Sequence, residues 1–122
     1  MKILLVDDDS FLLDMYATKF SASSHTVDTA KTVEIALEKL RSGATYDAVL
    51  LDMVLPGYTG VEFLKMIKDE NIGGTAKLIV LSNQSGDADK AEALQAGAVG
   101  YIIKAEMIPS EVVATVEKIF KP

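Results

Sequence analysis

The chain alternates short β-type runs with segments in which apolar residues recur every three or four positions. The runs at 47–51 and 77–81 are continuously apolar after their first, charged residue, which is typical of strands buried on both faces of a parallel sheet. The spacing between the runs indicates amphipathic helices that cover such a sheet. The predicted strands are 2–6, 25–29, 47–51, 77–81 and 99–103, and the clearest helical faces are Val33, Ala36, Leu37 and Leu40, and Val112, Val113, Val116, Ile119 and Phe120.

Residues at the predicted boundaries suit the ends of helices. Ser10 and Thr32 stand where helices begin, and a hydroxyl there accepts a hydrogen bond from a free backbone N–H of the first turn. Gly43 and Gly97 stand where helices end, and glycine readily adopts the left-handed conformation that closes a helix. Pro109 lies near the start of the last helix, where its fixed φ is favourable.

Strict alternation of strands and helices implies right-handed crossovers between parallel strands. It predicts an α/β fold, a doubly wound (βα)5 three-layer sandwich around a five-stranded parallel sheet. The chain has 122 residues, of which 49% are hydrophobic, and this size suits a single core. We therefore predict one domain that spans residues 1–122.

Composition and charge exclude several classes of function. The chain has no cysteine, which leaves no disulfide and no thiolate metal site. The formal net charge of -6, without a cluster of Lys and Arg, argues against direct binding to nucleic acid. No apolar stretch reaches membrane-spanning length and no leader precedes the first strand, so we expect a cytoplasmic protein without membrane contact.

Polar side chains follow the predicted strands, except the second, where each strand ends. Because ligands of parallel α/β sheets bind beyond the carboxyl ends of the strands, these side chains are expected to share one site. Each taken alone has a plainer explanation as a helix start, a turn residue, a helix cap or a solvated strand end. Their joint occurrence favours a site. They are Asp7 and Asp8 after the first strand, Asp52 after the third, Ser82 after the fourth and Lys104 at the end of the fifth.

The chemistry of these groups indicates phosphoryl transfer. Three carboxylates raise one another's pKa unless a cation lies among them, and an oxygen-rich set favours Mg²⁺ as the cofactor. An aspartate beside such a metal can attack a phosphoryl group. A lysine and a hydroxyl, here Lys104 and Ser82, then stabilise the phosphoryl oxygens.

These motifs resemble a response-regulator receiver domain of the CheY type, and the resemblance covers the whole chain. The motifs are the acidic pair Asp7-Asp8, "LLDMVLPGYTG" around Asp52, "VLSNQ" with Ser82, and "GAVGYIIKA" with Lys104. The resemblance implies a flavodoxin-like fold with strand order 2-1-3-4-5, and a loop after the acceptor formed by Pro56, Gly57 and Gly60.

The resemblance also implies a role for each site residue. Asp52 would be the phosphoacceptor, Ser82 and Lys104 would bind phosphoryl oxygens, and Tyr101 would be the aromatic that turns inward when Ser82 moves. From the residues alone, Tyr101 could equally be a core aromatic with its hydroxyl at the surface. The Mg²⁺ ligands would be Asp8, Asp52 and the backbone carbonyl of Val54, with Asp7 acting mostly through water.

The sequence departs from the family pattern around Lys104 and Ser82. Ala105 stands where receivers usually have a proline joined by a cis peptide bond. A cis bond costs about 2.5–4 kcal/mol before alanine and about 0.5–1 kcal/mol before proline, so we expect a strained bond or a different loop. Asn83 replaces a smaller residue and should narrow access to the acyl phosphate. Val54 and Gln84 occupy positions that influence hydrolysis, and because Val54 cannot orient a water, we predict slow dephosphorylation.

We therefore expect a signalling switch rather than a turnover enzyme. It would accept a phosphoryl group from the phosphohistidine of a sensor histidine kinase or phosphotransfer protein. The response would alter the face formed by the fourth helix, the fifth strand and the fifth helix. Output would pass to a separate protein target, unless the chain is part of a longer regulator.

Three alternatives remain open at this point. A phosphatase of the haloacid dehalogenase type would use Asp7 as nucleophile, but it leaves Asp52 without a role and lacks a later acidic pair. A flavodoxin-like FMN-binding protein would place phosphate where aspartates stand. A degenerate receiver that only mediates protein contacts is compatible with Ala105.

Overall fold

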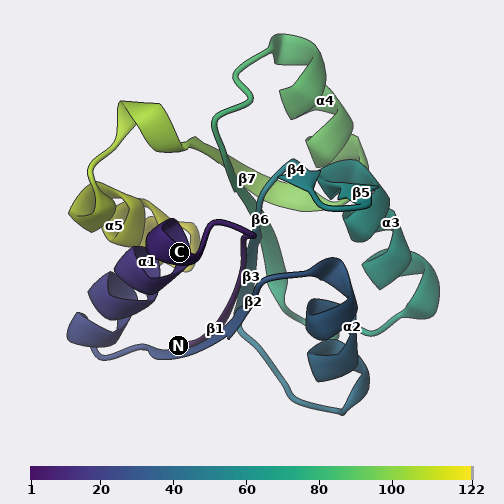
Figure 1. Ribbon diagram of the computed structural model, residues 1–122, viewed down its shortest axis with the longest axis horizontal. Coiled ribbons are helices and arrows are strands. Elements are labelled where there is room, and N and C mark those ends of the chain that lie inside the picture. Colours follow the sequence, from purple (N-terminus) through teal and green to yellow (C-terminus); the bar gives the residue numbers. More distant parts are fainter. Residues whose placement is uncertain (122) are drawn as a thin grey trace.

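Five parallel strands form the central sheet of the computed structural model, which describes residues 1–121. Their order is β2-β1-β3-β6-β7, which is 2-1-3-4-5 when the strands of this sheet alone are counted, so the predicted topology is confirmed (Figure 1). Pro122, the last residue of the predicted domain, lies outside the described residues. The strands are β1 (Lys2–Val6), β2 (Thr26–Ala30), β3 (Ala48–Leu51), β6 (Lys77–Ser82) and β7 (Ala98–Ile103).

Helices cover both faces of this sheet and complete three layers (Figure 1). On one face, α1 and α5 pack over a core that includes Leu13, Phe20 and Val116. On the other face lie α2, α3 and α4, whose core includes Leu37 and Phe63. The doubly wound α/β sandwich is therefore confirmed. The helices are α1 (Ser10–Ala22), α2 (Val33–Arg41), α3 (Gly60–Glu70), α4 (Asp87–Gln95) and α5 (Pro109–Ile119).

The central strand explains the continuous apolar runs. All four residues of β3 are buried, because helices cover the sheet on both sides. Burial of one such aliphatic side chain contributes about 1.5–3 kcal/mol. The apolar pattern thus places β3 in the interior and fixes Asp52, the next residue, at the carboxyl edge of the sheet.

The helix boundaries confirm the predictions with one correction. Thr32 caps α2, since its hydroxyl accepts a hydrogen bond from the backbone N–H of Ile35 at 3.1 Å. Gly43 and Gly97 have φ of +88° and +115° and follow the last turns of α2 and α4. Pro109 is the first residue of α5.

The prediction that Ser10 caps the first helix is wrong. Ser10 is the first helical residue, and the cap is Asp9, whose Oδ1 accepts a hydrogen bond from the backbone N–H of Leu12 at 3.1 Å. A carboxylate is as good a cap as a hydroxyl and also interacts favourably with the helix dipole. One of the three consecutive aspartates is therefore a structural residue.

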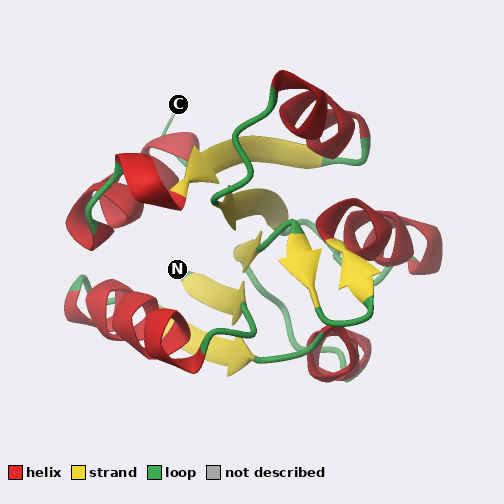
Figure 2. Ribbon diagram, turned by 45° about the horizontal axis from the view of Figure 1, so that its top comes forward, coloured by secondary structure: helices red, strands yellow, loops and turns green. Residues whose placement is uncertain are grey.

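Two small elements were not predicted. A hairpin of β4 (Val54–Leu55) and β5 (Tyr58–Thr59) follows Asp52 and lies apart from the main sheet (Figure 2). A 3₁₀ turn, η1 (Lys104–Glu106), follows β7. Neither has enough residues to show a hydrophobic period. No helix among residues 1–121 has the length and apolar character needed to cross a membrane.

Candidate functional site

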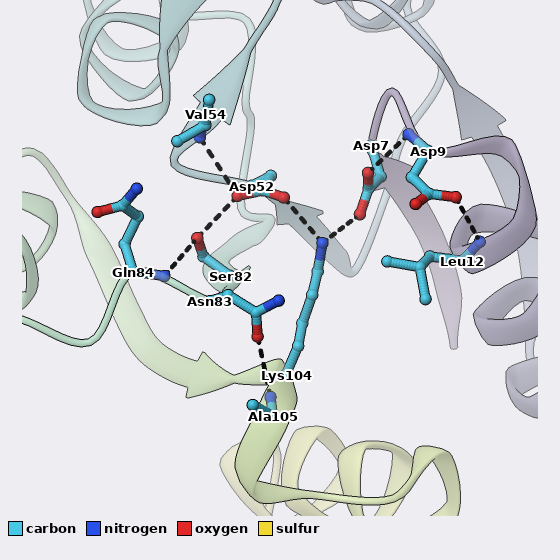
Figure 3. A network of polar contacts seen from close by, with 10 residues as sticks. All are labelled: Asp7, Asp9, Leu12, Asp52, Val54, Ser82, Asn83, Gln84, Lys104 and Ala105. Carbon is cyan, nitrogen blue, oxygen red and sulfur yellow. Dashed lines mark hydrogen bonds and ion pairs between the residues drawn. The ribbon is translucent and has the colours of Figure 1, made fainter.

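The carboxyl edge of the sheet brings together residues that are far apart in the sequence (Figure 3). Asp7 follows β1, Asp52 follows β3, Ser82 ends β6, and Lys104 begins η1 directly after β7. The edge exists because parallel strands all end on the same side. The structure thus places these four predicted residues in one connected network of hydrogen bonds.

Lys104 bridges two of the carboxylates. Its Nζ donates to Asp7 Oδ2 at 2.6 Å and to Asp52 Oδ2 at 2.8 Å. The side chains of Lys104, Asp7 and Asp52 are only 7%, 9% and 13% exposed, so water screens these ion pairs weakly. Burial by itself lowers the pKa of Lys104, but its bonds to Asp52 and Asp7 outweigh burial and the net pKa is raised. Lys104 is therefore a permanent cation at neutral pH.

Asp52 accepts hydrogen bonds on both carboxylate oxygens. Ser82 Oγ donates to Asp52 Oδ1 at 2.7 Å, and the backbone N–H of Val54 donates to the same oxygen at 3.2 Å. Ser82 also accepts a bond from the backbone N–H of Gln84 at 3.2 Å, which fixes its hydroxyl. Asp52 therefore stands at the centre of the network, which disfavours the phosphatase hypothesis that leaves it without a role.

The three consecutive aspartates have different surroundings and different contacts. Asp7 is buried. Its Oδ1 accepts a hydrogen bond from the backbone N–H of Asp9 at 2.9 Å, and its Oδ2 accepts one from Lys104. Asp9 caps α1, and Asp8 is exposed. All three line one cavity of about 480 Å³ together with Asp52. The acidic run thus serves one helix end and one concave site.

The donor chemistry of this cavity fits Mg²⁺. Its oxygen atoms are hard ligands, and Asp8 and Asp52 face it together with residue Val54. Among residues 1–121, no three or more carboxylate or imidazole side chains converge as a ready metal cage. Mg²⁺ ordinarily takes one or two protein carboxylates and keeps several waters, because it gives up its hydration water reluctantly.

Tyr101 links β7 to the loop that follows Ser82. Its hydroxyl donates to the backbone carbonyl of Gln84 at 2.6 Å, and the residue is half-buried. Burial raises the pKa of Tyr101, and the negative charges of Asp89 and Asp52 raise it further. The hydroxyl thus has a fixed partner, while the role of Tyr101 as a moving aromatic stays a prediction.

The loop after Lys104 differs from the family pattern. Of the two outcomes expected there, a strained cis bond or a different loop, the structure has the different loop. The described residues contain no cis peptide bond, so the Lys104–Ala105 bond is trans. The backbone N–H of Ala105 donates to Asn83 Oδ1 at 3.0 Å. The sequence does not predict this contact, because Asn83 there indicates only a side chain that narrows access to the acyl phosphate. The sequence does contain both partners. Residue 105 is alanine, which keeps the backbone N–H that a proline would lack, and residue 83 has a side-chain amide that can accept a hydrogen bond.

The chain belongs to the response regulator receiver domain family, whose model matches residues 3–117. Phosphoryl acceptance in two-component signalling is the general role of this family. Among curated proteins, the chain is 30% identical over 104 residues to the two-component response regulator PhoP of Pseudomonas aeruginosa, covering 85% of this chain and 45% of that protein. It is 28% identical to the transcriptional regulatory protein ResD of Bacillus subtilis, covering 98% of this chain and 48% of that protein.

Solved structures agree with this assignment. The chemotaxis response regulator CheY4 of Vibrio cholerae superimposes with a TM-score of 0.88 at 25% identity, covering 98% of both chains. The BeF3-activated receiver domain of DrrB superimposes with a TM-score of 0.83 at 30% identity, covering 99% of this chain and 97% of that one. The chain spans about half the length of the two curated relatives above.

Proposed function

We propose that residues 1–122 form one receiver domain in which Asp52 accepts the phosphoryl group. The observation that carries this proposal is the pairing of Asp52 with both Lys104 and Ser82, one on each carboxylate oxygen. These are the two donors that a phosphoryl group on Asp52 needs for its own oxygens. No other carboxylate among those lining the cavity makes both contacts.

The transfer is a displacement at phosphorus. A carboxylate oxygen of Asp52 forms the new O–P bond, while the P–N bond of a phosphohistidine breaks. The imidazole nitrogen leaves with the bonding electron pair and takes up a proton. Lys104 and Ser82 then turn from the oxygens of Asp52 to the added phosphoryl oxygens, where they offset negative charge.

Asp8, Asp52 and the backbone carbonyl of Val54 would hold Mg²⁺, with Asp7 acting through water. The ion supplies positive charge that offsets repulsion between an incoming phosphoryl group and the carboxylates. The contribution of this chain is to arrange two of the carboxylates around Lys104, which donates to Oδ2 of Asp7 and to Oδ2 of Asp52. Asp7, Asp8 and Asp52 all line the cavity.

The product of the reaction is a conformational state rather than a released compound. The switch would start from Ser82 and Tyr101, which are joined to the same loop through its residue Gln84. It would alter the face made by α4, β7 and α5, where Leu94 and Val99 are each 53% exposed. A protein target would read this face. The net charge of -6 disfavours a direct role for this domain in nucleic acid binding.

The partner would be a sensor histidine kinase or a phosphotransfer protein. We place the reaction in the cytoplasm because the phosphohistidine of such partners is made from ATP. The domain would act only on itself, accepting the group on Asp52 and later losing it to water.

A mass measurement tests the assignment of Asp52. The protein is incubated with Mg²⁺ and acetyl phosphate, and its intact mass is followed. The expected result is a phosphoryl adduct that does not form with EDTA or in Asp52→Asn. An adduct that persists in Asp52→Asn and maps to Asp7 would overturn the proposal and favour the phosphatase hypothesis.

A further inference from the structure

We propose that Asn83 is a positioning residue that holds Lys104 over Asp52 by accepting the backbone N–H of Ala105. This inference rests on the proposed function, because it assigns Asn83 a part in phosphoryl transfer to Asp52. Nothing in the pairing of Lys104 with the carboxylates requires Asn83 to touch them. Asn83 acts through the backbone of the loop that carries the lysine (Figure 3).

The sheet brings the two partners together. Strands β6 and β7 are adjacent and parallel, with Ser82 paired to Ile103 at their carboxyl ends. The next residues, Asn83 and Lys104, begin the two loops. The side chain of Asn83 spans the gap between these loops, and its Oδ1 lies 3.0 Å from the backbone nitrogen of Ala105.

The turn that carries Lys104 has little internal support. η1 is three residues long, and its N-cap residue Ile103 provides no side-chain hydrogen bond. Its closing bond, from the backbone N–H of Met107 to the carbonyl of Lys104, is long at 3.4 Å. Short 3₁₀ turns have poor hydrogen-bond geometry, and their first N–H groups lack partners within the turn. Asn83 supplies such a partner for Ala105, which a proline at this position could not use.

The position of this turn determines where the ammonium lies. Lys104 reaches Asp7 and Asp52 with bonds of 2.6 and 2.8 Å, so a shift of the turn by about 1 Å would either lengthen these bonds or force the stem into other rotamers. Lysine has a flexible stem and fixes no angle by itself. Misplacement of a catalytic group by about this distance can cost up to about a hundredfold in rate, and we expect about tenfold here.

The competing explanation is that Asn83 only narrows the cavity, whose lining includes it. The two explanations predict different rates for Asn83→Leu and Asn83→Ala. Leucine keeps the side-chain volume but lacks the hydrogen-bond acceptor, and alanine lacks both. Phosphorylation rates are measured with acetyl phosphate and saturating Mg²⁺. Positioning predicts that both variants are about tenfold slower. A faster Asn83→Ala with an unchanged Asn83→Leu would overturn the proposal.

A double-mutant cycle tests whether Asn83 acts through the lysine. In a Lys104→Ala background, Asn83→Leu should slow phosphorylation no further. The same tenfold loss in both backgrounds would overturn the proposal. Gln95→Leu, which removes an exposed amide at the end of α4, is the matched control and should leave the rate unchanged. Thermal unfolding of each variant separates loss of rate from loss of fold.

A measurement without any phosphoryl donor distinguishes a failure of this proposal from a failure of the proposed function on which it rests. Hydrogen exchange of the Lys104 ammonium is followed by nitrogen-detected NMR. In wild type the ammonium should exchange slowly because it is bonded and buried, and Asn83→Leu should speed exchange about tenfold. Unchanged exchange would overturn the positioning role. If wild type forms no adduct on Asp52 while exchange responds to Asn83→Leu, the proposed function fails and the positioning of Lys104 stands.

Discussion

At the scale of single residues, Lys104 is the cation that offsets the negative charge of the acidic edge. Asp7 and Asp52 are almost completely buried, and two such carboxylates would repel each other if no cation lay between them. Lys104 contacts both, and the pKa of its ammonium is raised by these contacts despite burial. In the proposed function, a phosphoryl donor would thus meet an Asp52 side chain that is held in place by Ser82 and already lies beside the lysine that would offset the added charge.

Val54 governs the lifetime of the phosphoryl group in our interpretation. Its side chain is 59% exposed and lines the cavity, but it is apolar and has no atom that can orient an attacking water. We expect slow hydrolysis of the phosphorylated wild type. Val54→Gln should shorten the lifetime about tenfold, less than an optimally placed general base achieves. This lifetime is measured by removing the phosphoryl donor and following the loss of the adduct by intact mass. An equal lifetime in both proteins would contradict the role of Val54.

At the scale of elements, the hairpin after Asp52 depends on close packing at Gly60. A Cβ built on this residue would lie 2.7 Å from both the carbonyl oxygen of Asp52 and the Cα of Met53. These are backbone atoms, which cannot move aside as a flexible side chain can. The first residue of α3 is therefore packed directly against the segment that carries Asp52.

Gly60→Ala should accordingly lower the free energy of unfolding by about 1–3 kcal/mol, the range for overpacking of a filled site. Urea denaturation measures this change. The matched control is Gly86→Ala, where a built Cβ would lie 3.1 Å from Oδ2 of Asp89, the end of a side chain. A loss for Gly86→Ala as large as that for Gly60→Ala would contradict the explanation.

A second element-scale contact joins β2 to the loop before β3. The hydroxyl of Tyr46 donates to Asp28 Oδ2 at 2.7 Å, and Tyr46 is 5% exposed. Burial raises the pKa of Tyr46 above its ordinary value of 10.0, and the bond to Asp28 raises it further. Because the folded-state pKa is the higher one, the stability from this bond is fully present below pH 10 and is lost as pH rises through the folded-state value.

Tyr46→Phe should therefore be less stable than wild type at pH 7, by about 1 kcal/mol for one hydrogen bond. The difference should shrink as the pH rises above about 10, because wild type loses stability there and the variant lacks this ionisation. Urea denaturation at pH 7 and at several values above pH 10 measures both. A difference that grows with pH would contradict this assignment.

At the scale of the whole molecule, the proposed Mg²⁺ site would link metal binding to folding. An ion that binds only the folded chain stabilises it by about 2.7 kcal/mol at one hundred times its dissociation constant. We expect MgCl₂ to raise Tm well beyond the effect of NaCl at equal ionic strength. Asp8→Asn should remove most of this shift, because it takes away an exposed carboxylate of the cavity that no helix cap occupies. An unchanged shift in Asp8→Asn would contradict its role as a ligand.

The sequence by itself determined the fold and the members of the site. Continuous apolar runs specified buried parallel strands, as β3 shows, and alternation with helical periods specified two covering layers. Since parallel strands end on one edge, the residues after them had to meet there. Asp7, Asp52, Ser82 and Lys104 could therefore be named in advance without knowing any distance.

Only the tertiary structure decided how the polar groups are paired. Three adjacent aspartates look alike in sequence, yet one is buried against Lys104, one is exposed and one caps α1 instead of Ser10. The bond between Asn83 and Ala105 joins residues 22 positions apart in the segments that follow two strands, and it leaves no periodic signal. The periodicity of hydrophobic residues indicates which face of a helix or strand is buried, and this is a property of the whole element. Hydrogen-bond partners depend on atomic positions that exist only once the strands are assembled.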